Sequence, residues 1–279
     1  RFYLKRILGM EACDDRKREL DPRDFGTICH SALKSLGHHS ELRNSTNPDS
    51  IAAYLIETAR RILEIQYGHQ PPAAVTIQLD SVIQRLRAAA EVQARLCADG
   101  WEIIAAEVPL DPSRATRFSP LPIRGTVDRV DRHPDGRIRL LDYKTTDSPH
   151  KPADTHWGPV RKTTADFAFT SDGKKERAWT DLQLPLYALL CDSVPDGAIP
   201  ECGYFNLPKA VTQTGIQLWD NLTAAHLQSA ARCAAGVAQS ILDGVFWPPA
   251  ETLQYDDFES LLFGNPAETA APPPISPRK

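Results

Sequence analysis

The sequence lacks most of the features that would assign a chain to a class at once. Its six cysteines are scattered, with no Cys-x-x-Cys pair, which argues against a zinc or disulfide framework and favours a reducing, cytoplasmic setting. No apolar run approaches the roughly 18 residues of a membrane-spanning helix, and the N-terminal stretch is too short and too charged for a signal peptide. A Gly-rich phosphate loop and a nucleophile elbow are missing as well, which disfavours a small-molecule enzyme. We therefore expect no membrane partner.

An excess of positive charge is also missing. The 279 residues carry a formal net charge of -4, with 24% charged and 42% hydrophobic residues, which is ordinary for a globular protein. Such a chain is not a generally basic nucleic-acid binder, so any polyanion that it handles must be met by a local positive site or by metal ions. Because position 1 is not Met, we expect a processed form or a part of a longer protein.

What the sequence does contain is an ordered series of helix and strand patterns. The clearest helix lies in LDPRDFGTICHSALKSLG, where Asp21 suits the N-cap, Pro22 the first helical position and Gly37 the stop. Further helices are expected at residues 50–67, 79–98, 181–191 and 223–242, and strands at 101–110, 122–131, 137–144, 202–207 and 216–219.

These elements predict an α/β (α+β) architecture in a single domain over residues 1–264, followed by a disordered Pro- and Ala-rich tail at 265–279. Within the domain we expect a helical subregion at 1–100, a sheet core at 101–207, and a C-terminal strand and helix at 208–264.

The strand expected at 137–144 carries charges where a buried face should end. With a period of two, one face of this strand holds Ile138, Leu140, Asp142 and Lys144. An apolar stripe therefore runs into a carboxylate and an ammonium. The simplest interpretation is a strand end whose lysine blunts an exposed edge.

The preceding turn favours a second interpretation. The loop 134–136 ends in a glycine that suits the left-handed position of a three-residue hairpin loop, which pairs His133 with Arg137. In that register Asp128 stands directly opposite Asp142, with Cβ atoms about 5 Å apart. A loop one residue longer or shorter would put the two aspartates on opposite faces. Two convergent carboxylates repel each other, and their natural compensator is a hard divalent cation such as magnesium or manganese.

Five stretches together carry a family resemblance. They are, in chain order, RFYLKRILG, FGTICHSAL, GTVDRVD, DGRIRLLDYKTTD and DLQLPLYALL. They resemble the nuclease domain of the RecB and AddB type, in the PD-(D/E)XK nuclease superfamily, over most of residues 1–250. The resemblance implies a central mixed β-sheet of the restriction-endonuclease-like type, flanked by helices and preceded by a helical subregion. It also implies Mg2+- or Mn2+-dependent hydrolysis of DNA phosphodiester bonds, leaving a 5′-phosphate and a 3′-hydroxyl.

The resemblance further implies a role for each matched residue. The implied metal ligands are His30, Asp128, Asp142 and the backbone carbonyl of Tyr143. The implied catalytic group is Lys144, acting with Asp128 and Asp142 and supported by Gln183 and Tyr187, with Glu107 as a further acidic member. The implied partners are single-stranded DNA or duplex ends, and a helicase domain or subunit that lies upstream or acts in trans.

Each of these residues also has a purely structural interpretation. His30 could be a half-buried, hydrogen-bonded histidine. Gln183 could complete a capping box with Thr180, and Tyr187 could simply pack. Solvated strand faces are the expected place of three nearby charged residues, Arg124, Arg129 and Asp131.

Basic and aromatic residues interleave in the polar segment 145–180. The basic residues that we expect to contact DNA are Lys162, Lys174, Lys175 and Arg177. This mixture suits contact with a single-stranded backbone combined with base stacking. A mobile surface loop is the alternative.

One departure from the resemblance concerns an iron-sulfur cluster. AddB-type relatives commonly hold one with a trio of cysteines after the last helix, whereas FWPPAETLQYDDFESLLFG in this chain contains no cysteine. We expect no iron-sulfur cluster, because one upstream thiolate cannot supply four ligands. Packing of the aromatic and leucine side chains in 246–263 is expected to replace it.

Two functions remain open. One is a metal-dependent DNA nuclease, as the C-terminal domain of a RecB/AddB-like helicase-nuclease or of a related DNA repair or recombination factor. The other is a nuclease-like module that binds single-stranded DNA and has lost its catalytic role. Lapsed domains usually lose an acidic residue or the lysine, and this chain keeps all of them.

Overall fold

The computed structural model of the chain describes residues 18–245, of which residues 18–238 form one compact unit. The C-terminal aromatic cluster and the Pro- and Ala-rich tail expected from the sequence lie outside the described residues. Within the described range, no helix is long and apolar enough to cross a bilayer.

The described chain opens with three helices, α1 (Pro22–His38), α2 (Pro48–Tyr67) and α3 (Ala73–Ala98). The start of α1 confirms the sequence pattern, because the Asp21 side chain accepts hydrogen bonds at its N-terminus and Asp24 completes a capping box. Gly37 does not end the helix. It is buried inside α1, where an added Cβ would lie 2.5 Å from the Cβ of Ala106, so the glycine permits close packing of α1 on the first strand.

Five strands form a central mixed sheet in the order β1-β2-β3-β7-β8. Their bounds are Glu102–Pro109 (β1), Thr126–Arg132 (β2), Ile138–Lys144 (β3), Glu201–Asn206 (β7) and Gly215–Leu218 (β8). The β3–β7 pair is parallel and the other three pairs are antiparallel. This arrangement confirms the α/β class and the mixed, helix-flanked sheet expected from the sequence.

The β2–β3 hairpin has the predicted register. The His133 N–H donates to the Arg137 carbonyl at 3.0 Å, and Val130 pairs with Leu140. Gly136 adopts a left-handed φ of 93°, as a three-residue loop of this kind requires. Continued by two residues, this register sets Asp128 opposite Asp142.

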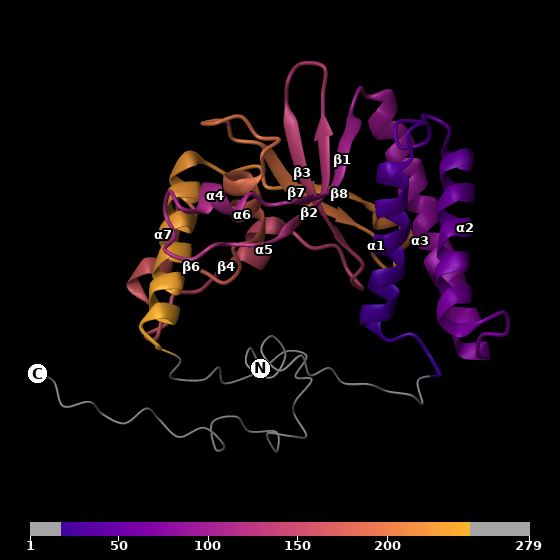
Figure 1. Cartoon of the computed structure of the whole chain (residues 1–279), viewed down its shortest axis with the longest axis horizontal. Coiled ribbons are helices and arrows are strands. Elements are labelled where there is room, and N and C mark those ends of the chain that lie inside the picture. Colours follow the sequence, from indigo (N-terminus) through magenta and orange to yellow (C-terminus); the bar gives the residue numbers. More distant parts are fainter. Residues whose placement is uncertain (1–17, 246–279) are drawn as a thin grey trace, which may run out of the picture. The chain divides into compact units, whose positions relative to one another are not determined.

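Helices cover both faces of the central sheet, as Figure 1 shows for α1 to α3 on one side and α4, α6 and α7 on the other. The additional helices are α4 (Pro112–Ala115), α5 (Pro152–His156), α6 (Gln183–Leu190) and α7 (Ala224–Leu242), with short 3-10 turns η2 (Asp166–Ala168) and η3 (Val211–Gln213). Leu141 and Tyr143 of β3 belong to the core beneath α1 to α3, whereas Leu140 belongs to the core beneath α6 and α7. β3 therefore lies between two apolar layers.

The segment 145–180 is more ordered than the sequence indicated. It contains a three-stranded antiparallel sheet in the order β4-β6-β5, formed by Trp157–Gly158 (β4), Glu176–Trp179 (β6) and Phe169–Ser171 (β5). Phe167 packs on α7 at Gly236, where an added Cβ would approach its ring to 2.2 Å. The segment is thus a folded part of the unit, and the surface-loop interpretation is wrong for these strands.

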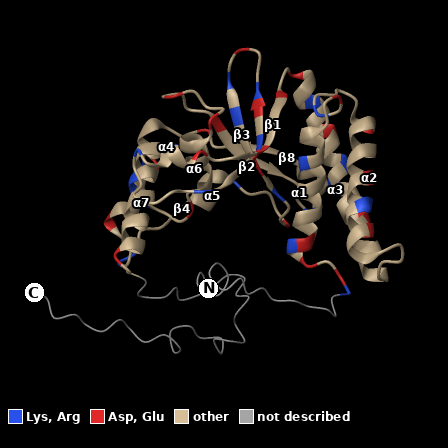
Figure 2. Ribbon diagram, in the orientation of Figure 1, with Lys and Arg blue, Asp and Glu red and all other residues tan. Residues whose placement is uncertain are grey.

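Charged residues of both signs are spread over the fold. Figure 2 shows Lys and Arg interspersed with Asp and Glu on helices and strands, in agreement with the small net charge. Within residues 18–245, binding of a polyanion would therefore have to depend on a local site.

Candidate active site

An open cleft of about 680 Å³ lies at the ends of β2 and β3. Side chains from α1, both strands and α6 line it. Its polar lining includes His30, Asp128, Asp142, Lys144, Gln183 and Tyr187. The fold thus brings together residues that are up to 157 positions apart in the chain, from position 30 to position 187.

The two opposed aspartates form the centre of this cleft. Asp142 is only 4% exposed, and the Asp128 side chain is 13% exposed. Burial and the neighbouring negative charge of Asp142 raise the pKa of Asp128 to about 7. The Asp128 Oδ2 accepts a hydrogen bond of 2.8 Å from the backbone N–H of Tyr143, which pins this carboxylate against β3.

His30 reaches the same carboxylate from the helical layer. Its Nε2 lies 2.9 Å from the Tyr143 carbonyl, and its Nδ1 lies 3.4 Å from the Asp128 Oδ2. Gly26 stands one turn earlier in α1, where an added Cβ would be 3.1 Å from the Oγ1 of Thr145. The glycine therefore lets α1 approach the end of β3. This placement agrees both with a ligand role for His30 and with a half-buried, hydrogen-bonded histidine.

Lys144 closes the opposite wall of the cleft. Its Nζ lies 2.7 Å from the Asp142 Oδ2 and donates a hydrogen bond of 3.2 Å to the Gln183 Oε1. The Lys144 side chain is 24% exposed, so its ammonium is fixed by neighbours yet remains open to the cleft. An ammonium has three N–H donors, so these two contacts leave at least one donor for a molecule in the cleft.

Helix α6 orients the buried carboxylate through two side chains one turn apart. The Asp142 Oδ1 accepts hydrogen bonds from the Gln183 Nε2 at 2.7 Å and from the Tyr187 hydroxyl at 3.3 Å. The capping-box interpretation of Gln183 is wrong. Helix α6 begins at Gln183 itself, the Asp181 side chain accepts from its backbone N–H, and the Thr180 hydroxyl donates to the Thr155 carbonyl instead.

Glu107 lies beside this centre, outside the residues that line the cleft. Its neighbours in β1 pair with Arg129 and Val127, so Glu107 faces the position of Asp128. Its negative charge raises the pKa of Asp128, after the larger effects of burial and Asp142. Glu107 also has a left-handed φ of 54°, an unusual conformation for a strand residue, and lies 3.7 Å from the Nζ of Lys34.

The basic residues expected to bind DNA lie elsewhere. None of Lys162, Lys174, Lys175 and Arg177 lines this cleft. Arg177 is held by the Asp172 carboxylate at 2.7 Å, and the same carboxylate caps the turn that carries the two lysines. The exposed cation at the rim of the cleft is Arg124, just before β2.

Two of the charges assigned to solvated strand faces are buried. Arg129 and Asp131 form a bidentate ion pair at 2.6 and 2.9 Å, with side chains only 2% and 0% exposed. These two side chains are buried because helices α1 to α3 cover the face of the sheet on which they lie, whereas Val130 lies on the other face. A sheet with helices on both faces has no solvated face at its centre. The burial of Arg129 and Asp131 could therefore have been predicted from the expected architecture.

Arg85 is a structural residue that the sequence patterns missed. It projects from α3, is 6% exposed, and donates to the carbonyls of Thr145 and Leu207 at 3.0 Å each. These bonds tie down the ends of β3 and β7 directly after Lys144. Its place on the apolar face of α3, three residues after Val82 and four before Ala89, was the available indication.

The donor atoms around the cleft can be tested for their fit to a metal ion. Among residues 18–245, no three His, Cys, Asp or Glu side chains form a ready-made cage. Burial lowers the pKa of His30, and a neutral imidazole that donates to the Tyr143 carbonyl has no hydrogen left on Nδ1. When Asp128 is ionised, that nitrogen faces the Asp128 Oδ2, acceptor against acceptor. A cation between them would resolve both this contact and the repulsion between Asp128 and Asp142, so the donor set fits a hard divalent ion.

Comparison with known protein families assigns this geometry to a class. Residues 1–253 match the model of the PD-(D/E)XK nuclease superfamily. The chain therefore belongs to this superfamily, and membership indicates nuclease activity. No curated protein sequence matches the chain significantly.

Proposed function

We propose that the chain is a divalent-metal-dependent deoxyribonuclease that hydrolyses phosphodiester bonds in this cleft. The observation that carries the proposal is the convergence of Asp128, Asp142 and Lys144 on one open cleft, with Asp142 oriented by Gln183. A lysine that only protected the edge of a sheet would point into solvent. Lys144 instead contacts a buried carboxylate and a glutamine from helix α6.

In this proposal His30, Asp128, Asp142 and the Tyr143 carbonyl would hold Mg2+ or Mn2+. A bound divalent cation supplies Lewis acidity, which offsets charge on the scissile phosphate and lowers the pKa of a coordinated water. Tyr187 and Gln183 hold the Asp142 carboxylate in one orientation.

Lys144 acts on the reacting groups directly. Its remaining N–H donor can orient the attacking water or stabilise the negative charge that develops on the phosphate. The Asp142 and Gln183 contacts fix the position of the ammonium beforehand, so little reorganisation is needed when substrate binds.

The finer assignment follows the family resemblance. We propose that the chain is the nuclease domain of a RecB/AddB-like helicase-nuclease or of a related repair or recombination factor, and that it acts on single strands or duplex ends.

The test is a cleavage assay on end-labelled single- and double-stranded DNA with Mg2+, Mn2+ or excess chelator. We expect cleavage with either metal, none in chelator, and none with the Asp142→Asn variant, whose shape is conserved. Binding of DNA by the wild-type protein without cleavage under every metal condition would favour a lapsed binding module instead. Cleavage that persists in chelator would remove the metal from the mechanism.

A further inference from the structure

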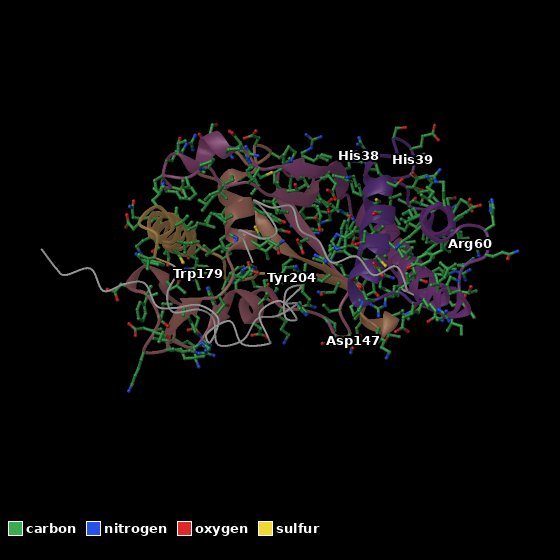
Figure 3. The ribbon with its side chains drawn as sticks, turned by 60° about the horizontal axis from the view of Figure 1, so that its bottom comes forward. His38, His39, Arg60, Asp147, Trp179 and Tyr204 are labelled. Atoms are coloured by element: carbon green, nitrogen blue, oxygen red, sulfur yellow. The ribbon has the colours of Figure 1, made fainter. Side chains whose placement is uncertain are left out.

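Lys144 has one neighbour that belongs to none of the motifs discussed above. Its Nζ lies 4.9 Å from the centroid of the Tyr204 ring, on the ring's face. Tyr204 comes from β7, where it pairs with Asp142 across the parallel β3–β7 ladder. The Tyr204 side chain is fully buried within the fold (Figure 3), so its ring forms a floor beneath the ammonium.

The Tyr204 ring is itself held rigidly. Its hydroxyl lies 3.0 Å from the Nε2 of His156, whose Nδ1 lies 2.9 Å from the Asp181 carbonyl. A carbonyl can only accept, so the Nδ1 of His156 carries the hydrogen and its Nε2 accepts from the Tyr204 hydroxyl. Burial lowers the pKa of His156, which keeps the imidazole neutral and this direction of donation fixed.

These contacts close a loop around the lysine. The Asp181 side chain accepts from the backbone N–H of Gln183 at 2.6 Å, and the Gln183 side chain accepts from Lys144. The imidazole of His156 also stacks on the Trp219 ring, with the two ring centroids 4.9 Å apart. Every group in the loop therefore has a partner on each side, and Tyr204 is the member that faces the ammonium without a hydrogen bond.

We propose that Tyr204 is a positioning residue for Lys144, and that its ring face holds the ammonium where Asp142 and Gln183 can orient it. A cation over an aromatic face is attracted by the ring quadrupole, most strongly where water is excluded. This inference rests on the proposed function for its catalytic consequence, whereas the contact itself can be tested without activity.

The electrostatic role can be separated from packing by three changes at one position. Tyr204→Phe keeps the ring and removes the bond to His156. Tyr204→Met fills a similar volume without a ring face. Tyr204→pentafluorophenylalanine keeps the shape and reverses the ring quadrupole, so it tests the proposal even where the Met variant fails to fold.

The first measurement is the rate of reductive methylation of Lys144, followed by mass spectrometry in metal-free protein. We expect wild-type protein and Tyr204→Phe to react slowly. The Met and pentafluorophenylalanine variants should react several times faster, because the Lys144 amino group is no longer held against an attractive ring face. Equal rates in all four proteins would overturn the proposal.

The second measurement is steady-state cleavage together with calorimetric metal titration. We expect kcat to fall about tenfold in the Met and pentafluorophenylalanine variants and to stay within about threefold in Tyr204→Phe, with unchanged metal Kd and KM. A weaker metal Kd that parallels the loss of kcat would overturn the proposal, because the ring would then act through its strand partner Asp142.

Phe205→Leu is the matched control. Phe205 is the next residue of β7, is fully buried and packs in the opposite core. We expect it to lower Tm while Lys144 methylation and kcat stay at wild-type values. If the wild-type protein cleaves no DNA but methylation changes as expected, the proposed function fails and the positioning contact stands. The opposite pattern rejects the contact alone.

Discussion

The raised pKa of Asp128 makes the metal-free protein sensitive to pH in a predictable direction. The pKa of the Asp128 carboxyl group is 3.8 in the unfolded chain and about 7 in the folded protein. Between these values the folded state binds the extra proton, so stability falls as the pH rises through this window and the loss is complete above pH 7. The rise of the pKa from 3.8 to about 7 corresponds to about 4 kcal/mol of unfolding free energy.

The perturbation that isolates this effect is Asp128→Asn. The amide keeps the shape and cannot ionise, so the variant should lack the contribution of Asp128. His30 titrates with the opposite sign, because its lowered pKa makes stability rise as the pH passes through the pKa of the unfolded histidine. Since both proteins contain His30, the part of its titration that does not depend on Asp128 cancels when the two stability curves are subtracted.

Urea denaturation in chelator at half-unit steps from pH 4.5 to 8.5 provides the measurement. We expect the stability of the variant relative to the wild-type protein to rise by about 3 kcal/mol between pH 4.5 and 8, because part of the effect has already occurred below pH 4.5. Adding Mg2+ should recover most of the wild-type loss at high pH and leave the variant unchanged. Two curves that run parallel across the whole range would refute the inference that Asp128 and Asp142 repel each other in the folded protein.

Three further predictions concern separate parts of the fold. Lys144→Ala removes no proposed ligand, so we expect cleavage to fall by about two to four orders of magnitude in a turnover assay while calorimetry still detects metal binding. Reversing Lys174 and Lys175 to Glu should lower the salt dependence of DNA binding by about two counterions, measured by fluorescence anisotropy, and an unchanged slope would exclude this turn from the DNA path. Gly203→Ala should destabilise the unit by more than about 2 kcal/mol in urea titration, because the new Cβ would lie 2.5 Å from the Gln217 carbonyl oxygen.

The part of the site that depends on local pattern was predictable. Hairpin loop length fixes register, and register fixes which side chains share a face, so the opposition of Asp128 and Asp142 followed from a single glycine turn. The start of α1 followed in the same way from its capping residues. Its end did not, because Gly37 serves close packing against β1, a contact that no local pattern reveals.

The part that depends on distant pairing was not predictable from the sequence. Tyr204 lies under Lys144 because β7 pairs in parallel with β3 across a connection of about 56 residues, and local periodicity does not set the register of such a pair. The strands of 145–180 escaped detection for another reason. They are two to four residues long, too short to establish an alternating pattern.

The charged end of β3 follows from the position of this strand between two layers. Its alternating residues enter two different cores, so the last residues of the strand emerge where both cores end and can be approached from either side. Helix α1 brings His30 to one side, and α6 brings Gln183 and Tyr187 to the other.

Asp142 and Lys144 are tolerated at the end of β3 because each has a charged partner, but the ammonium offsets only one of two carboxylates. The centre formed by Asp128, Asp142 and Lys144 therefore keeps one excess negative charge when all three are ionised, and a phosphate would add another. A divalent cation offsets both of these negative charges, so the charge count of the residues favours a metal in the cleft before the substrate binds.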